Sequence, residues 1–289
     1  AADTSNQQVL QSQVAELGLD HRVHLRFDLT DAEKEDLLDA SDFFFSPIDN
    51  LQETFGISIV EAMARGLPVL ASDFDGYREL VEHGITGFRI PTTMVKPSHD
   101  FTELTGILEP RVAQLAMAQH VSVDVGQLVS RMRQLANSPD LRDRLGTAGR
   151  ERVRETYTWR SVLTRYEQLW AELAERCAGQ DPTHAAMDPA LVEHADIFQG
   201  YPTHILGPES TLHVTELGQS ILDGHQPLPA PFSDMGPLLS FRDLRLLLER
   251  LRKGPVAFEQ LRPVVPNGGV QGLESHVGWL LKYGLIRTG

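Results

Sequence analysis

The chain has 289 residues, a formal net charge of −14 and a single cysteine, Cys177. The length suits two domains of typical size, and the negative charge argues against broad binding to nucleic acid or to anionic membranes. One cysteine excludes an intrachain disulfide and a cysteine metal cluster, so we expect a reducing, cytoplasmic location. No apolar run is long enough for a membrane span. The chain does not start with Met, and we expect it to begin inside a longer protein.

The first 90 residues alternate between helical and strand patterns. We expect helices over residues 7–17, 30–40, 56–66 and 77–82, and strands over residues 23–27, 42–46, 68–72 and 87–90. The continuous apolar run in Asp42–Ser46 predicts a strand buried on both faces. Alternation at this pitch predicts an α/β fold, with a Rossmann-like parallel sheet covered by helices on both sides.

The alternation lapses after residue 90. Residues 91–120 read as an insertion without a clear strand, which we interpret as a surface excursion, the alternative being an element that binds an acceptor or a partner. Three amphipathic helices are expected over residues 124–137, from 138 onward and over 159–178. A linker over residues 179–190 then separates a first domain, residues 1–178, from a second, residues 191–289.

The second domain resembles a winged helix in its order of elements. A strand is expected over residues 212–215, helical segments over 241–253, 258–261 and 272–282, and a last strand over 285–287. Basic side chains gather on and beside the helix at 241–253, but residues 272–277, in the recognition position, contain neither Arg nor Lys. Base and phosphate contacts require such residues, so we favour a structural role or a protein partner over nucleic acid.

The most informative stretch runs from Glu53 to Ser72. Gly56 lets a ligand approach the backbone, because it has no Cβ. The helix that begins there offers unpaired N–H groups and a positive dipole end, and Glu61 lies about one and a half turns into it. Gly66 ends the helix. These features predict a site for a ligand that carries phosphate and hydroxyl groups.

The same residues carry a family resemblance. Glu53 and Glu61, with Phe55-Gly56 between them and Glu61-Ala62-Met63-Ala64-Arg65-Gly66-Leu67-Pro68-Val69 after them, resemble the signature of retaining glycosyltransferases of the GT-B fold, in the group that includes sucrose synthases and bacterial mannosyltransferases. Flanking matches come in the expected order, at Leu17–Val23, Ala40–Asp42, Ser46-Pro47, Glu82–Phe88 and Tyr157–Trp159, so that the resemblance covers roughly residues 7–172.

The resemblance implies a role for each matching position. Glu53, the catalytic-site residue, would contact hydroxyls of the donor sugar. Thr54, Phe55, Gly56 and Ile57 would complete the donor site, the last three through backbone amides to the sugar and diphosphate. Glu61 would accept hydrogen bonds from the ribose diol of the nucleotide, which suits a group with two acceptor oxygens.

The resemblance also implies parts that we do not find in the chain. The family's early arginine and lysine, the first strand of the nucleotide domain and the acceptor-binding domain would precede residue 1. The chain therefore resembles the donor half of a longer enzyme, with an unidentified acceptor. Residues 25–28 depart from the family, which commonly has a glycine after this strand, near the nucleotide base.

Each signal has an alternative. Glu53 and Glu61 could be solvated acids, and Asp73-Phe74-Asp75 imitates a metal-binding Asp-x-Asp, although a turn with helix-capping carboxylates is favoured after a parallel strand. No other acidic or His cluster has metal-ligand spacing, and we expect neither a metal nor another cofactor. The chain could instead be a non-catalytic interaction protein with a degenerate nucleotide-sugar fold, or a nucleotide-sugar epimerase or phosphorylase.

Overall fold

The computed structural model describes residues 4–51, 53–178, 198–230, 238–265 and 272–289. It divides into two units, Ala1–Asp42 and Phe43–Gly289. The expected linker at 179–190 lies outside the described residues. The division into domains 1–178 and 191–289 therefore stays a prediction.

The first unit contains two helices, α1 (Thr4–Glu16) and α2 (Asp31–Asp39). Helix α2 begins with the capping box that its sequence predicts, because the Thr30 side chain accepts from the Glu33 amide and the Glu33 carboxylate accepts from the Thr30 amide. None of residues 7–42 is buried. The strand predicted over residues 23–27 is wrong, because no strand is formed there.

The second unit begins with three parallel strands in the order β1 (Phe44–Ser46), β2 (Val69–Ser72) and β3 (Gly87–Ile90). Phe45 pairs with Leu70, and Leu70 with Phe88. All four residues of β2 are buried, as expected of a central strand between helical layers. The prediction that β1 is buried on both faces is wrong, because β1 is an edge strand and Phe45 is 48% exposed.

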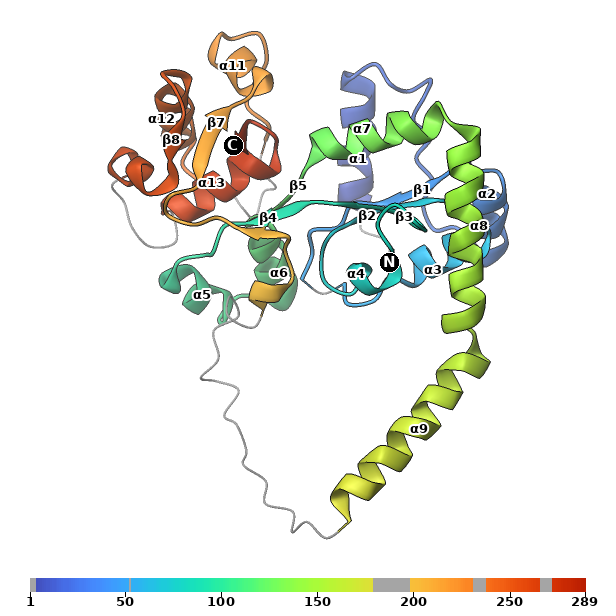
Figure 1. Ribbon diagram of the computed structural model, residues 1–289. Coiled ribbons are helices and arrows are strands. Elements are labelled where there is room, and N and C mark those ends of the chain that lie inside the picture. The colour runs from blue at the N-terminus through green and yellow to red at the C-terminus, as the bar shows by residue number, and fades with distance from the viewer. Residues whose placement is uncertain (1–3, 52, 179–197, 231–237, 266–271) are drawn as a thin grey trace. The chain divides into compact units, whose positions relative to one another are not determined.

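Helices cover the two faces of this sheet (Figure 1). Helix α3 (Ile57–Ala64) contacts β1 and β2 and buries Ile59 and Met63, and α4 (Tyr77–Leu80) follows β2 on the same side. Helix α7 (Val125–Ala136) packs across the other face, where Leu128 and Leu135 join the strand side chains. Helix α8 (Pro139–Thr156) contacts both α3 and α7. The α/β fold with a parallel sheet is confirmed.

Residues 91–123 contain regular structure, and strand β4 within them corrects the prediction that residues 91–120 hold no clear strand. The segment forms β4 (Thr92–Met94), α5 (His99–Thr105), α6 (Pro110–Ala118) and β5 (Val121–Val123). Strand β4 pairs antiparallel with β5 and parallel with β6 (His204–Ile205), a pairing that joins Thr93 to His204. The insertion is thus completed by a segment more than a hundred residues further along the chain.

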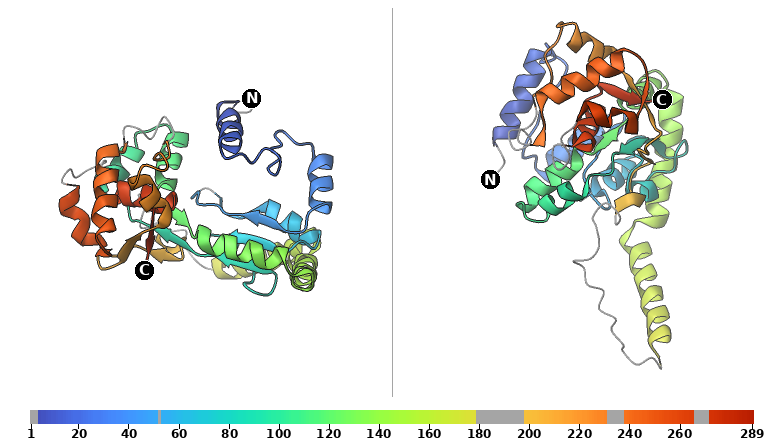
Figure 2. Two further views of the ribbon diagram at one scale, coloured as in Figure 1. Left: turned by 90° about the horizontal axis from the view of Figure 1, so that it is seen from above. Right: turned by 90° about the vertical axis from the view of Figure 1, so that its left-hand side faces the viewer.

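The C-terminal residues add a second small sheet and its helices. They form the 3-10 turn η2 (Phe198–Gly200), β7 (Thr211–Val214), α11 (Glu216–Leu222), α12 (Phe241–Arg252), β8 (Val256–Ala257), η4 (Phe258–Val264), α13 (Leu273–Lys282) and β9 (Ile286–Thr288), with the antiparallel strand order β8-β7-β9. Helix α13 also contacts β5, and Figure 2 shows the orange and red C-terminal helices beside the segment of residues 91–123. We call residues 91–123 together with the described residues of 198–289 the composite lobe.

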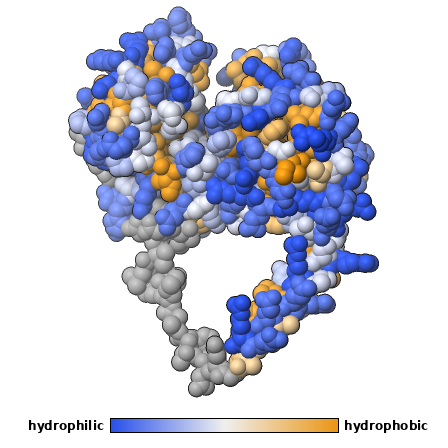
Figure 3. Space-filling model, in the orientation of Figure 1, coloured by the Kyte–Doolittle hydropathy of each residue, from blue (hydrophilic) through white to orange (hydrophobic). Residues whose placement is uncertain are grey.

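Helix α9 (Trp159–Cys177) has no buried residue. Several of its apolar side chains are exposed, among them Trp159 at 80% and Trp170 at 62%. The face of this helix seen in Figure 3 is mostly hydrophilic, with scattered apolar atoms. No described helix combines the length and the hydropathy that a membrane span requires.

Candidate functional site

The candidate site lies where β1 and β2 end. Parallel strands have their carboxyl ends at the same edge of a sheet, and α/β proteins bind ligands there. The chain leaves β1 at Ser46 and reaches α3 through residues 47–56, and it leaves β2 at Ser72 and reaches α4 through residues 73–76. The Ser46 hydroxyl lies 3.0 Å from the Tyr77 hydroxyl, which joins the two connections.

Gly56 fits tightly against Tyr77. Its φ is +91°, in the left-handed region that favours glycine, and a Cβ there would overlap the Tyr77 ring. Gly56 is the N-cap of α3 and provides no side-chain cap, and the Ile59 amide bonds the Gly56 carbonyl at 3.0 Å. Helix α3 therefore begins without a side-chain cap from Gly56, and the N–H groups of a helix start can bind an anion.

A second glycine, Gly76, fixes the backbone of Thr54, which lies two positions before Gly56. A Cβ on Gly76 would overlap the carbonyl oxygen of Thr54, so the start of α4 approaches the loop at backbone distance. Gly76 has an ordinary helical φ of −60°, so steric fit and not backbone conformation demands the glycine here. The backbone at Thr54–Gly56 is thus held by the turn that follows the neighbouring strand.

The predicted site residues lie on this loop and helix. Glu53 and Glu61 are half-buried, Gly56 is buried, and Thr54, Phe55 and Ile57 are exposed. Burial raises the pKa of Tyr77, and the negative charge of Glu53 adds to this rise. The structure places Gly56 against the Tyr77 ring and Glu53 three residues before it on the same loop. Their roles toward a ligand stay predictions.

Sequence reasoning missed Tyr77 and Ser46 as members of this site. Tyr77 was expected only as the first residue of a short helix, and Ser46 as the end of a strand. Their positions carried a signal, because each lies at or just after the carboxyl end of a parallel strand.

The aromatic ring of Phe55 packs on Tyr157, with the ring centroids 6.0 Å apart in an edge-to-face arrangement. The Tyr157 hydroxyl donates to the Glu79 carbonyl at 3.1 Å, and Arg152 donates to the same carbonyl oxygen and pairs with Glu82. Phe55 is 44% exposed and is therefore held on one side and open on the other.

The far end of α3 is fixed against α8. Gly66 has φ +79° and ends the helix, as predicted. A Cβ on Gly146 of α8 would overlap the Gly66 carbonyl oxygen, and Arg150 donates to the Arg65 carbonyl. Two helices that approach at backbone distance leave α3, and with it Glu61, little freedom to shift.

The Asp73-Phe74-Asp75 sequence forms a turn, and its first carboxylate contacts protein side chains. The Asp73 carboxylate lies 3.3 Å from Arg78 Nε and 3.5 Å from Arg89 Nη1, and it accepts from the Thr203 hydroxyl at 2.9 Å. The predicted capping role is wrong, because Gly76 is the N-cap of α4 and no side chain caps it. In the part of the chain that the structure describes, no three His, Cys, Asp or Glu side chains lie together as metal ligands would.

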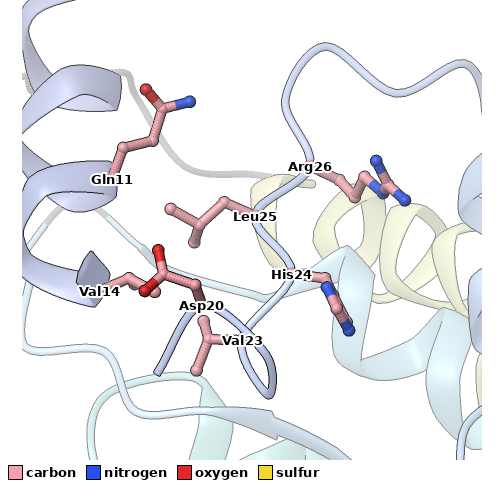
Figure 4. Close-up of a pocket in the computed structure, with 7 residues that line it drawn as sticks. All are labelled: Gln11, Val14, Asp20, Val23, His24, Leu25 and Arg26. Carbon is pink, nitrogen blue, oxygen red and sulfur yellow. The ribbon is translucent and has the colours of Figure 1, made fainter. Parts of the chain in front are cut away.

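The first unit holds a separate pocket of about 250 Å³ (Figure 4). It is lined by polar and apolar side chains from α1 and the following loop: Gln11, Val14, Asp20, Val23, His24, Leu25 and Arg26. Leu25 points toward α1, whereas His24 and Arg26 point the opposite way. The segment thus alternates like a strand and includes the residues that depart from the family pattern, but it forms no strand pairing.

Comparison with known proteins finds a family that part of the chain is similar to. Residues 3–100 match the family model of glycosyl transferases group 1. The chain is 29% identical over 165 residues to MMP alpha-(1->4)-mannosyltransferase of Mycolicibacterium hassiacum, covering 57% of this chain and 33% of that protein. It is 41% identical over 71 residues to phosphatidyl-myo-inositol mannosyltransferase of Mycobacterium leprae, covering 24% of this chain and 18% of that protein.

Solved structures give a weaker likeness. Sucrose-phosphate synthase from Thermosynechococcus elongatus is 22% identical, with a TM-score of 0.43 over 60% of this chain and 35% of that chain. Anabaena HepE, solved in complex with UDP and glucose, is 23% identical, with a TM-score of 0.40 over 60% of this chain and 37% of that chain. The chain spans about a third or less of the length of the curated relatives it matches. Over residues 3–100, and so at the candidate site, the chain is similar to glycosyl transferases group 1.

Proposed function

We propose that the chain is the donor-binding part of a longer glycosyltransferase, which transfers a sugar from a nucleotide-diphosphate sugar to an unidentified acceptor with retention of anomeric configuration. The observation that carries this proposal is the loop and helix Glu53–Glu61 at the carboxyl edge of a parallel sheet, within the matched segment 3–100. The mannosyltransferase relatives support it, since they act on sugars by their names.

Each site residue has a proposed task. The uncapped start of α3 at Gly56 and Ile57 would donate backbone N–H groups to the diphosphate, whose charge the helix dipole also stabilises. Glu53 would accept hydrogen bonds from sugar hydroxyls, with Thr54 and Phe55 beside it. Glu61 would accept from the ribose diol. This arrangement meets the phosphate charge without a metal ion, and we propose no metal or other cofactor.

The C-terminal residues 191–289 are proposed to be a winged-helix-like region. Its order of elements supports this, but its third helix, α13, buries most of its side chains, including Val277 and Trp279. A helix packed on both sides does not reach bases in a groove, which supports a structural role or a protein partner over nucleic acid. A cytoplasmic location stays a prediction from the single cysteine.

The direct test is calorimetric titration of the 289-residue chain with UDP-glucose, GDP-mannose, UDP and GDP. We expect one nucleotide series to bind and Glu61→Ala to weaken that binding by about 10- to 100-fold, because it removes charge-assisted hydrogen bonds worth about 1.5–3 kcal/mol. Glu167→Ala, on exposed α9, is the matched control and should bind like wild type. No binding by a folded wild-type chain, or an unchanged affinity in Glu61→Ala, would overturn the proposal.

A further inference from the structure

The loop that carries Glu53 is held at its amino end by the composite lobe. Asp49 forms an ion pair with Lys282, the last residue of α13, across 233 positions of sequence. The two side chains are 30% and 16% exposed, so the pair is screened far less than a surface pair is. A residue near the C-terminus thus contacts the loop four positions before the candidate sugar-binding carboxylate.

Lys282 uses its whole hydrogen-bonding capacity at this point. Its ammonium group has three donors and no acceptor. Besides Asp49, it donates to the Ala118 carbonyl at 3.0 Å and approaches the Val121 carbonyl at 3.4 Å. One cation therefore ties together the loop after β1, the end of α6 and the start of β5.

Apolar contacts around Asp49 join the same parts. Ile48 and Leu51 pack on a cluster that includes Phe74, Met94 and Val121. Leu51 also packs on Phe101, Ala116 and Met117 of helices α5 and α6. The Ile48 carbonyl accepts from the Ser72 hydroxyl at 2.6 Å, so this part of the loop is fixed to β2 as well.

A backbone hydrogen bond links Glu53 to the residue that follows Asp49. The Glu53 amide donates to the Asn50 carbonyl at 3.3 Å, directly after the residue that Lys282 holds. On the other side of Glu53, the Thr54 backbone is fixed against Gly76. The placement of the Glu53 carboxylate therefore depends on both neighbours.

We infer that Lys282 is a positioning residue for the donor-sugar site: through Asp49 it sets the loop from which Glu53 would contact the sugar of a nucleotide-diphosphate sugar. The inference rests on the proposed function, and it gives the composite lobe a part in donor binding. Nucleotide contacts at α3 and Glu61 lie beyond Gly56, which is held by α4. Loss of Lys282 should therefore affect the sugar more than the nucleotide.

The test has one arm that needs no ligand. Amide hydrogen exchange of residues 48–53 in the full chain is compared between wild type, Lys282→Met and Lys282→Arg. We expect amide exchange to be at least roughly tenfold faster in Lys282→Met than in wild type, because the ion pair opposes local unfolding of this segment. In Lys282→Arg the exchange should slow again toward the wild-type rate. Leu247→Ala, in the buried face of α12, controls for general destabilisation of the lobe, and Lys253→Met controls for loss of a surface lysine. Both should leave the exchange rates of residues 48–53 unchanged.

The second arm measures binding. Lys282→Met should weaken UDP-glucose or GDP-mannose, whichever binds wild type, by about tenfold, and should change the affinity for the matching nucleoside diphosphate by less than about twofold. Asp49→Asn should have the same effect, and the double variant no further one.

Failure of the proposed function and failure of the positioning inference would give different results. If no nucleotide sugar binds wild type, the proposed function falls, and the positioning role toward it falls too, even where the exchange arm shows the contact. Two outcomes in a wild type that does bind would overturn the positioning inference alone. One is an exchange rate of residues 48–53 in Lys282→Met that equals the rate in Leu247→Ala. The other is an equal loss of affinity for the nucleotide sugar and for the nucleoside diphosphate in Lys282→Met.

Discussion

The two ends of the loop over residues 47–56 are held in different ways. At the carboxyl end, the backbone of Thr54–Gly56 is held by close approach to Gly76 and Tyr77, in a turn about twenty residues away. At the amino end, Asp49 is held by Lys282, from the far end of the chain. The first arrangement belongs to the parallel sheet itself, whereas the second depends on a lobe assembled from two distant segments. Changes to the sheet region and to the lobe should therefore act on different ends of one loop.

The largest expected effect is at the carboxyl end. Gly76→Ala should lower the free energy of unfolding by about 3 kcal/mol, because the added methyl group would overlap a backbone oxygen that cannot move aside as a flexible side chain would. Urea unfolding measures this value. Gly200→Ala, where a Cβ meets nothing, is the control and should stay within about 0.5 kcal/mol of wild type. A small effect in Gly76→Ala would show that the loop is not held there.

Acid should act on the lobe that holds the amino end. Burial lowers the pKa of His120 from 6.5 to about 4, with a smaller contribution from the Lys282 charge, and its ring packs on Phe101. Neutral His120 is favoured in the folded state, so its stabilisation is complete above pH 6.5 and is lost as pH falls toward 4. Between pH 6.5 and 4.5 the loss is about 2 kcal/mol.

Urea unfolding at several pH values, with His120→Gln as the non-titrating reference, checks this expectation. The wild type should lose about 2 kcal/mol more than His120→Gln over that range. Hydrogen exchange at pH 5 should also rise in residues 48–51 before it rises at 54–56. Equal pH dependence in the two proteins would contradict the assignment of His120 as a buried neutral group.

A smaller effect is expected from the hydrogen bond that joins β1 to α4. Tyr77→Phe removes the 3.0 Å contact with Ser46 and should cost about 1 kcal/mol, whereas the ring that covers Gly56 stays. Ser46→Ala should cost a similar amount, and the double variant little more than either one. Additive costs in this cycle would show that the two hydroxyl groups do not interact.

The carboxyl end of the loop could largely be predicted from the sequence. Gly56 and Gly66 bound the helix as expected, and the capping box at Thr30 and Glu33 is confirmed, because these signals are local in the chain. Glu53 and Gly56 were both chosen from one motif, and the structure packs Gly56 against the Tyr77 ring.

The amino end could not be predicted, because its partners are distant in sequence. Nothing near Thr93 indicates His204 as its strand partner, and nothing near Asp49 indicates Lys282. The same limit explains the wrong strand at residues 23–27: alternation shows which sides the side chains take, but a strand also needs a neighbour to pair with. The exposure of Phe45 likewise follows from the place of β1 at the edge of the sheet.

The central claim is that the loop contacts the sugar and α3 contacts the nucleotide. It is tested most directly by titrating wild type, Glu53→Gln and Glu61→Gln with UDP and UDP-glucose, or with GDP and GDP-mannose if wild type prefers guanine. We predict that Glu61→Gln weakens the nucleotide and the nucleotide sugar equally, by about tenfold, and that Glu53→Gln weakens only the nucleotide sugar. Equal losses in Glu53→Gln for both ligands, or none in either variant, would contradict the account.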